Sequence, residues 1–133
     1  MNNYFINARK VCIIGDEPIF LFGLQEQFKS WGFRSIEFIK TAEFNLQMVI
    51  SQKPGLLLVV DKPGKEQYWL QLAERISHSV QVPVILLSTM DAGPLPATGA
   101  MQEGINYILL SKPCHTEDLK AAVERLLEIH IAA

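Results

Sequence analysis

Four short apolar runs in this chain each lead to a polar residue whose side chain can take part in chemistry. The runs cover residues 11–14, 56–60, 84–87 and 107–110. The polar residues that follow them are Asp16, Asp61, Ser88 and Lys112. Continuous apolar runs of this length are typical of strands buried on both faces of a parallel sheet. Because the carboxyl ends of such strands share one edge, we expect two carboxylates, a hydroxyl and an amine to meet there.

These four side chains match the needs of phosphoryl transfer to a carboxylate. Such a transfer needs a nucleophilic carboxylate, a magnesium ion and donors for the phosphoryl oxygens. Asp61 could act as the nucleophile and hold magnesium together with Asp16, since magnesium prefers oxygen ligands. Lys112 could pair with one phosphoryl oxygen, and Ser88 could donate a hydrogen bond to another. Each also has a structural alternative, namely a helix cap (Asp16), a turn (Asp61), a strand-end hydroxyl (Ser88) or a salt bridge (Lys112).

The segments between the runs have the spacing of helices. Pro18 suits the first turn of one helix, and Gly32 suits its C-terminal cap. The other expected helices run from about Thr41 to Lys53, from Glu66 to Ser77, and from His115 or Thr116 onward. Residues 34–39 alternate polar and apolar, which predicts a strand at the sheet edge with one face exposed to solvent.

The stretch from Asp91 to Gly104 is rich in proline and glycine, so we expect only a short helix there, beginning near Ala97. The order along the chain is then strand and helix, five times over. This alternation predicts an α/β fold with a five-stranded parallel sheet, right-handed crossovers and five helices distributed over both faces. We expect residues 1–133 to form a single domain with a core of about residues 9–131.

The composition excludes several classes of protein. With 49% hydrophobic and 20% charged residues the chain is not disordered, and a net charge of −2 lacks the basic excess of a nucleic-acid surface. No apolar stretch approaches the ~20 residues that cross a bilayer, and the first ten residues do not have the pattern of a secretory signal. The two cysteines form no disulfide or metal spacing. We therefore expect a cytoplasmic protein with no membrane contact and no direct nucleic-acid contact.

The ordered set of motifs resembles the receiver domain of bacterial response regulators over nearly the whole chain. The matching elements are Asp16-Glu17-Pro18, the run from Pro83 to Ser88, and Lys112-Pro113. The resemblance implies a flavodoxin-like three-layer fold and a signalling domain rather than an enzyme. It also implies that Asp61 accepts a phosphoryl group with Ser88 and Lys112 beside it, and that Asp16 and Asp61 hold magnesium.

Three positions depart from the family pattern. Gly15 replaces the first acid of the pair after strand one. Two carboxylates beside a lysine attract a dication less strongly than the three acids of a complete site, so we expect weak magnesium binding. Asp61 lies seven residues after Pro54, where the family's acceptor lies six after the matching proline. This spacing puts Val60 at the acceptor position unless the strand holds an extra residue. Leu109 stands where the family has its aromatic switch residue.

Three classes of function remain open on the sequence. The first is a receiver domain in phosphorelay signal transduction, and the second is a degenerate pseudo-receiver that acts as a phosphorylation-independent protein-interaction module. The third is a flavodoxin-like ligand binder or a small aspartate-nucleophile hydrolase. Pro63 stands where the hydrolase needs a second acid after Asp61, and the acidic loop at residues 15–18 is unsuited to a flavin phosphate.

The partners that the resemblance implies are proteins. A sensor histidine kinase or a phosphotransfer protein would dock near the first helix. Homodimerisation through the last helix and strand is a further option. The output would pass to a downstream effector protein or to a fused output domain.

Overall fold

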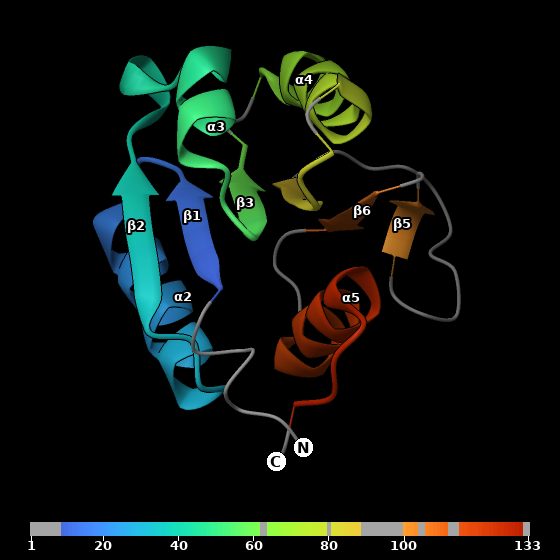
Figure 1. The fold of residues 1–133 in the computed structure, drawn as a ribbon. Helices are drawn as coiled ribbons and strands as arrows, with labels where there is room; N and C mark the ends of the chain where they lie inside the picture. Colours follow the sequence, from blue (N-terminus) through green and yellow to red (C-terminus); the bar gives the residue numbers. More distant parts are fainter. Residues whose placement is uncertain are drawn as a thin grey trace.

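The computed structural model describes residues 9–61, 64–79, 81–88, 100–103, 106–111 and 115–131. These residues form one six-stranded sheet in the order β2-β1-β3-β4-β6-β5 (Figure 1). The strands are β1 (Lys10–Ile14), β2 (Ser35–Ile39), β3 (Leu56–Val60), β4 (Val84–Ser88), β5 (Ala100–Glu103) and β6 (Tyr107–Ser111). Five of them run parallel, and β5 pairs antiparallel with β6.

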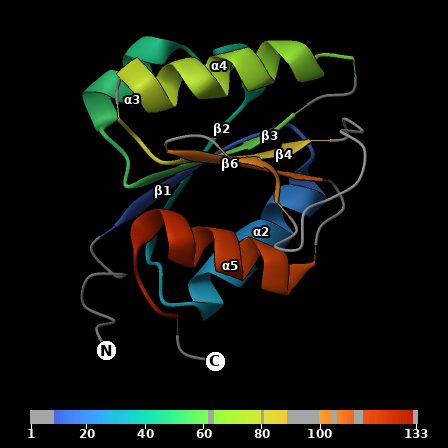
Figure 2. The same ribbon diagram turned by 90° about the vertical axis from the view of Figure 1, so that its right-hand side faces the viewer.

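Helices cover both faces of the sheet. They are α2 (Pro18–Ser30), the 3₁₀ helix η1 (Thr41–Glu43), α3 (Leu46–Gln52), α4 (Glu66–Ser79) and α5 (Thr116–Leu127). Figure 2 shows α2 and α5 on one face and α3 and α4 on the other. The predicted three-layer α/β architecture is therefore confirmed. None of the helices within the described ranges has both the length and the apolar content that a membrane span requires.

The sheet divides the core into two clusters because side chains alternate along each strand. The cluster under α2 and α5 includes Val11, Ile13, Leu58, Val60 and Leu87. The cluster under α3 and α4 includes Cys12, Ile14, Leu57, Val59 and Leu86. Trp69, Leu72, Ala73 and Ile76 form one face of α4, and this face is buried in the second cluster. Since both faces of the central strands are covered, their apolar runs are continuous in the sequence.

Local capping decides where two of the helices begin and end. α2 begins at Pro18 as predicted, and it ends just before Gly32, whose φ of 107° closes the turn. The second helix begins later than the sequence predicts. Thr41 starts the short η1, and α3 begins only at Leu46, where the Asn45 side chain accepts a hydrogen bond from the Met48 amide at 3.0 Å.

The proline- and glycine-rich stretch is the main difference from the predicted fold. β5 occupies part of the segment where a short fifth helix was expected, and it forms the edge of the sheet beside β6. Residues 89–99, which include the expected helix start at Ala97, lie outside the described residues. The described part of the chain thus has four α-helices and a sixth strand. The other edge strand, β2, lies where its alternating sequence predicts.

Candidate functional site

The carboxyl ends of β3 and β4 lie side by side and carry two of the predicted site residues. Val60 pairs with Leu87, and the Asp61 amide donates a hydrogen bond to the Leu87 carbonyl at 3.0 Å. Asp61 therefore lies one step beyond this pair, next to Ser88, which ends β4. Both residues are buried, with exposed fractions of 2% for Asp61 and 0% for Ser88. The sheet thus brings a carboxylate and a hydroxyl together at one edge.

Lys112, the predicted amine of the site, lies outside the described residues. The residue before it, Ser111, is the last residue of β6 and pairs with Ser88 across the parallel ladder. β6 therefore ends at the same sheet edge as β4.

Asp16 follows β1 at this edge, and its carboxylate is bound by Thr41, the first residue of η1, which follows the neighbouring strand β2. Oδ1 accepts a hydrogen bond from the Thr41 amide at 3.0 Å, and Oδ2 accepts one from the Thr41 hydroxyl at 2.6 Å. The N-cap residue of α2 is Glu17 and not Asp16. The sequence predicts a helix start at Thr41 and does not indicate this contact. The signal available was its place two residues after Ile39, the last residue of the edge strand that pairs with β1.

The pairing of β3 shows whether this strand holds an extra residue, a point that the sequence alone leaves open. Its residues pair in unbroken register with β1 and with β4, so the strand holds no extra residue. By the spacing of the resemblance, the sixth residue after Pro54 is Val60, an apolar residue, and Asp61 follows it. Val60 packs in the cluster under α2 and α5, whereas alternation assigns Asp61 to the opposite side of the sheet.

Gly15 is packed directly against this position. A Cβ atom added at Gly15 would lie 3.3 Å from the Cβ of Val60 and 2.9 Å from the Cδ2 of Leu21. The 3.3 Å distance to Val60 is shorter than most contacts that real Cβ atoms make. The 2.9 Å distance to Leu21 is shorter than real Cβ atoms essentially ever show. Gly15 and Val60 therefore lie against each other at the end of β1 and β3, and neither residue carries an acid.

The described residues fit magnesium poorly. Magnesium takes near-octahedral oxygen ligands, usually including one or two carboxylates. Gly15 offers no side-chain oxygen, and both carboxylate oxygens of Asp16 already accept hydrogen bonds from Thr41. Across the part of the chain that the structure describes, no group of three histidine, cysteine or acidic side chains is placed to hold a metal ion.

The position of the family's aromatic switch is also occupied differently. Leu109 is 1% exposed and packs in the cluster under α3 and α4. The nearby aromatic residue is Tyr107, which is 2% exposed and donates its hydroxyl hydrogen bond to Glu74 Oε2 on α4 at 3.0 Å. Its ring is therefore held inside the core at the amino end of β6.

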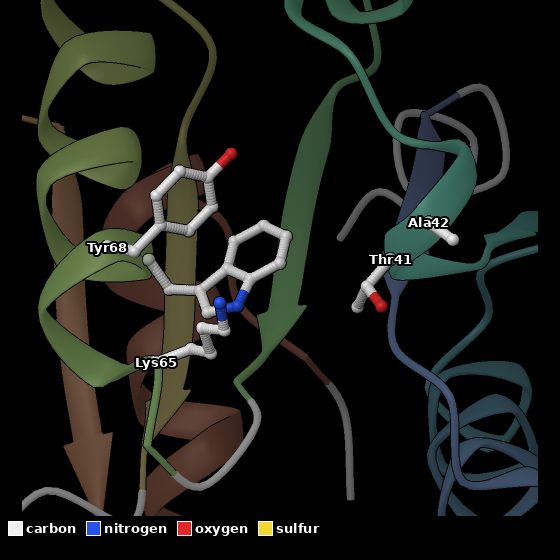
Figure 3. A pocket seen from close by; sticks show the side chains of 5 residues that line it. Thr41, Ala42, Lys65 and Tyr68 are labelled. Carbon is white, nitrogen blue, oxygen red and sulfur yellow. The ribbon is translucent and has the colours of Figure 1, made fainter.

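A cavity of about 310 Å³ lies beside the Asp16–Thr41 contact, between η1 and the start of α4 (Figure 3). It is lined by Thr41, Ala42, Lys65, Tyr68 and Trp69. Trp69 is buried in the core, and the sequence does not reveal the cavity beside it. Its only signal was two adjacent aromatic residues in the first turn of α4, because the opposite wall comes from a distant segment.

Comparisons with known proteins support the fold. No protein-family model matches the chain, and no curated protein matches it. Among solved structures, it is similar to the receiver domain of a signal transduction histidine kinase from Syntrophus aciditrophicus, with a TM-score of 0.66 and 22% identity over 91% of each chain. The receiver domain of a sensor histidine kinase from Pseudomonas aeruginosa, solved with magnesium in its active-site cleft, has a TM-score of 0.63 and 19% identity, covering 90% of this chain and 98% of that one.

A third similar structure is the response regulator PhyR from Brucella abortus, with a TM-score of 0.64 and 20% identity over 91% of this chain. This chain spans about half of that protein, since the match covers 48% of its length. The similarity extends over nearly all of the chain while the identities stay low. The chain therefore has the fold of a response regulator receiver domain.

Proposed function

We propose that this chain is a receiver-fold signalling module that works through protein contacts without phosphoryl transfer, as a pseudo-receiver. The observation that carries this proposal is the unbroken register of β3, which puts Val60 and not an acid against Gly15. The Asp16–Thr41 contact and the burial of Leu109 support it further. The module is a signalling domain rather than an enzyme, and it acts in the cytoplasm.

The second candidate is phosphorylation of Asp61. Its support is the position of Asp61 beside Ser88, and the end of β6 at Ser111 on the same edge, one residue before Lys112 in the sequence. In that case the Asp61 carboxylate would attack the phosphorus of a donor such as acetyl phosphate, and acetate would leave. Ser88 and Lys112 would then stabilise the phosphoryl oxygens. Magnesium bound by Asp16 and Asp61 belongs to this candidate only.

The two candidates differ in one measurement, the intact mass of the full chain after incubation with acetyl phosphate and magnesium. The pseudo-receiver predicts no added phosphoryl group, while a standard receiver domain in the same tube gains one and shows that the reagent works. A gain of one phosphoryl group that is lost in Asp61→Asn would overturn the proposal in favour of the second candidate.

Magnesium affinity gives an independent comparison. The pseudo-receiver predicts that magnesium binds about tenfold or more weakly than to a standard receiver, because one acid is missing and Asp16 is engaged by Thr41. Isothermal titration of both proteins in one buffer measures the difference. Equal affinities would contradict the interpretation of the site.

The surface that supports a protein partner lies on α2. Ile19 and Phe22 are spaced three residues apart on this helix, and their exposed fractions are 90% and 60%. Exposed apolar pairs of this kind favour contact with another apolar helix surface. The proposed partner is a sensor histidine kinase or a phosphotransfer protein.

Co-purification from the source cells tests this surface. A named kinase or phosphotransfer protein should be recovered with the natural chain and lost with Phe22→Asp. Lys29→Asp, which also changes an exposed residue of α2, is the control and should retain the partner. Equal recovery with Phe22→Asp would remove α2 from the proposal.

A further inference from the structure

The cavity between η1 and α4 combines an aromatic wall with a single cationic side chain. Trp69 is 5% exposed and forms the deep wall, and its ring meets the ring of Tyr68 edge to face with centroids 5.2 Å apart. Tyr68 is 57% exposed, so one of its surfaces is open. Figure 3 shows Lys65 and Tyr68 on one side of the cavity and Thr41 and Ala42 on the other. Neither phosphoryl transfer nor the α2 surface uses these residues.

The cavity has the size and lining of a small-molecule site. About 310 Å³ lies at the lower end of the range for ligand pockets, which is enough for one or two fused rings. Aromatic walls with one or two placed polar groups are typical of such pockets, because the rings give contact area and the polar group sets orientation. The occupant therefore has a flat apolar body.

The charges around the cavity define the polar end of the occupant. The Lys65 side chain is exposed and makes no ion pair with any residue in the described part of the chain. On the opposite wall, the Thr41 hydroxyl already donates to Asp16, which places a carboxylate behind that wall. An anionic group is therefore attracted to the Lys65 side and repelled from the Thr41 side.

We propose that this cavity binds a small aromatic carboxylate, with its rings against Trp69 and Tyr68 and its carboxylate paired with Lys65. The orientation follows from the two opposite charges, and the contact with Tyr68 is available without rearrangement. Because Thr41 both lines the cavity and holds Asp16, a bound acid would touch the segment that positions this carboxylate. Binding itself needs neither a phosphoryl group nor magnesium.

The test is calorimetric titration of the full chain, without magnesium or phosphodonor, using three probes. Naphthylacetate carries the rings and the charge, naphthylethanol carries the rings alone, and acetate carries the charge alone. We expect naphthylacetate to bind about tenfold or more tightly than either of the others. In ¹H–¹⁵N spectra it should shift the Trp69 indole signal and the amides of Thr41 and Ala42.

Two lysine variants separate this site from general charge effects. Lys65→Met keeps an unbranched side chain that lacks only the terminal ammonium position. It should lower the affinity for naphthylacetate about tenfold and leave the affinity for naphthylethanol unchanged. Lys29→Met removes an exposed charge on α2, across the sheet, and should leave both affinities unchanged. Ala42→Leu adds volume to the cavity lining and should weaken both ring-bearing probes.

Several results would overturn the proposal. They are equal binding of acetate and naphthylacetate, an unchanged naphthylacetate affinity in Lys65→Met, spectral shifts that map away from the cavity, or no binding of naphthylacetate. All of these measurements are independent of the mass assay on Asp61. Failure of one proposal therefore leaves the other to be judged on its own data.

Discussion

Replacing Gly15 by alanine tests the packing that distinguishes this chain from the family pattern. The new methyl group would lie 2.9 Å from Leu21 Cδ2 and 3.3 Å from Val60 Cβ. The Leu21 contact can relax because it involves the end of a flexible side chain. The Val60 contact cannot relax in the same way, because this Cβ is fixed to the central strand β3.

The size of the effect follows from two opposing contributions. Overpacking a well-filled core costs roughly 1–3 kcal/mol, with the lower half expected here because Leu21 can move. Removing a glycine from the unfolded chain returns about 0.4–1 kcal/mol. The net expectation is a loss of about 1 kcal/mol, which lowers the urea midpoint by about 0.5 M for a slope of about 2 kcal/mol per M.

Gly23→Ala is the matched control, since it makes the same chemical change on the exposed part of α2. A Cβ at Gly23 has no atom within 4 Å, and the residue lies inside the helix. Alanine is favoured over glycine in a helix by about 1 kcal/mol, so this variant should raise the urea midpoint. The two glycine variants should thus shift in opposite directions. If Gly15→Ala also raised the midpoint, the tight contact with Val60 would not exist.

Three further predictions use the same unfolding assay. Thr41→Val removes the hydroxyl bond to Asp16 and should cost about 1 kcal/mol, whereas Thr41→Ser keeps the bond and should cost less; equal losses would contradict the contact. Tyr107→Phe removes a partly buried hydrogen bond to Glu74 on α4 and should also cost about 1 kcal/mol of stability. An unchanged urea midpoint would show that this bond does not stabilise the fold. The hydrogen bond from Lys10 lowers the pKa of Glu37, so the bond stabilises the fold above the ordinary glutamate pKa and is lost as the pH falls through the lowered value. Glu37→Gln should therefore destabilise at about pH 7 and match the natural chain at about pH 2, and a constant difference would exclude this pair as the cause.

The strands were predictable because burial on both faces leaves a continuous apolar run in the sequence. β3 and β4 are examples, and their ends place Asp61 and Ser88 together as expected. The start of α3 was not predictable from Thr41, because this residue's hydrogen-bonding groups serve a carboxylate 25 positions earlier in the chain. β5 was missed because its pairing depends on β6 and not on a local period.

The candidate site was predictable in its position but not in its chemistry. Sheet topology alone brings the strand ends together, whereas the partner of Asp16 and the fit of Gly15 against Val60 depend on packing between distant segments. The cavity near Trp69 has the same origin. Local spacing marks Trp69 as an inward residue of α4, but only the folded chain shows that η1 leaves space beside it.

The division of the core into two clusters has a consequence for how this molecule could integrate signals. The partner surface on α2 and the cavity beside α4 lie on opposite faces of a close-packed sheet. The dense interior of the sheet resists small displacements, so the most direct link between the two sides is the Asp16–Thr41 contact, which joins the cavity lining to the residue two positions before α2. We therefore expect the thermodynamic coupling between the two events to be small and to pass through this contact, so that the domain would report two inputs largely side by side.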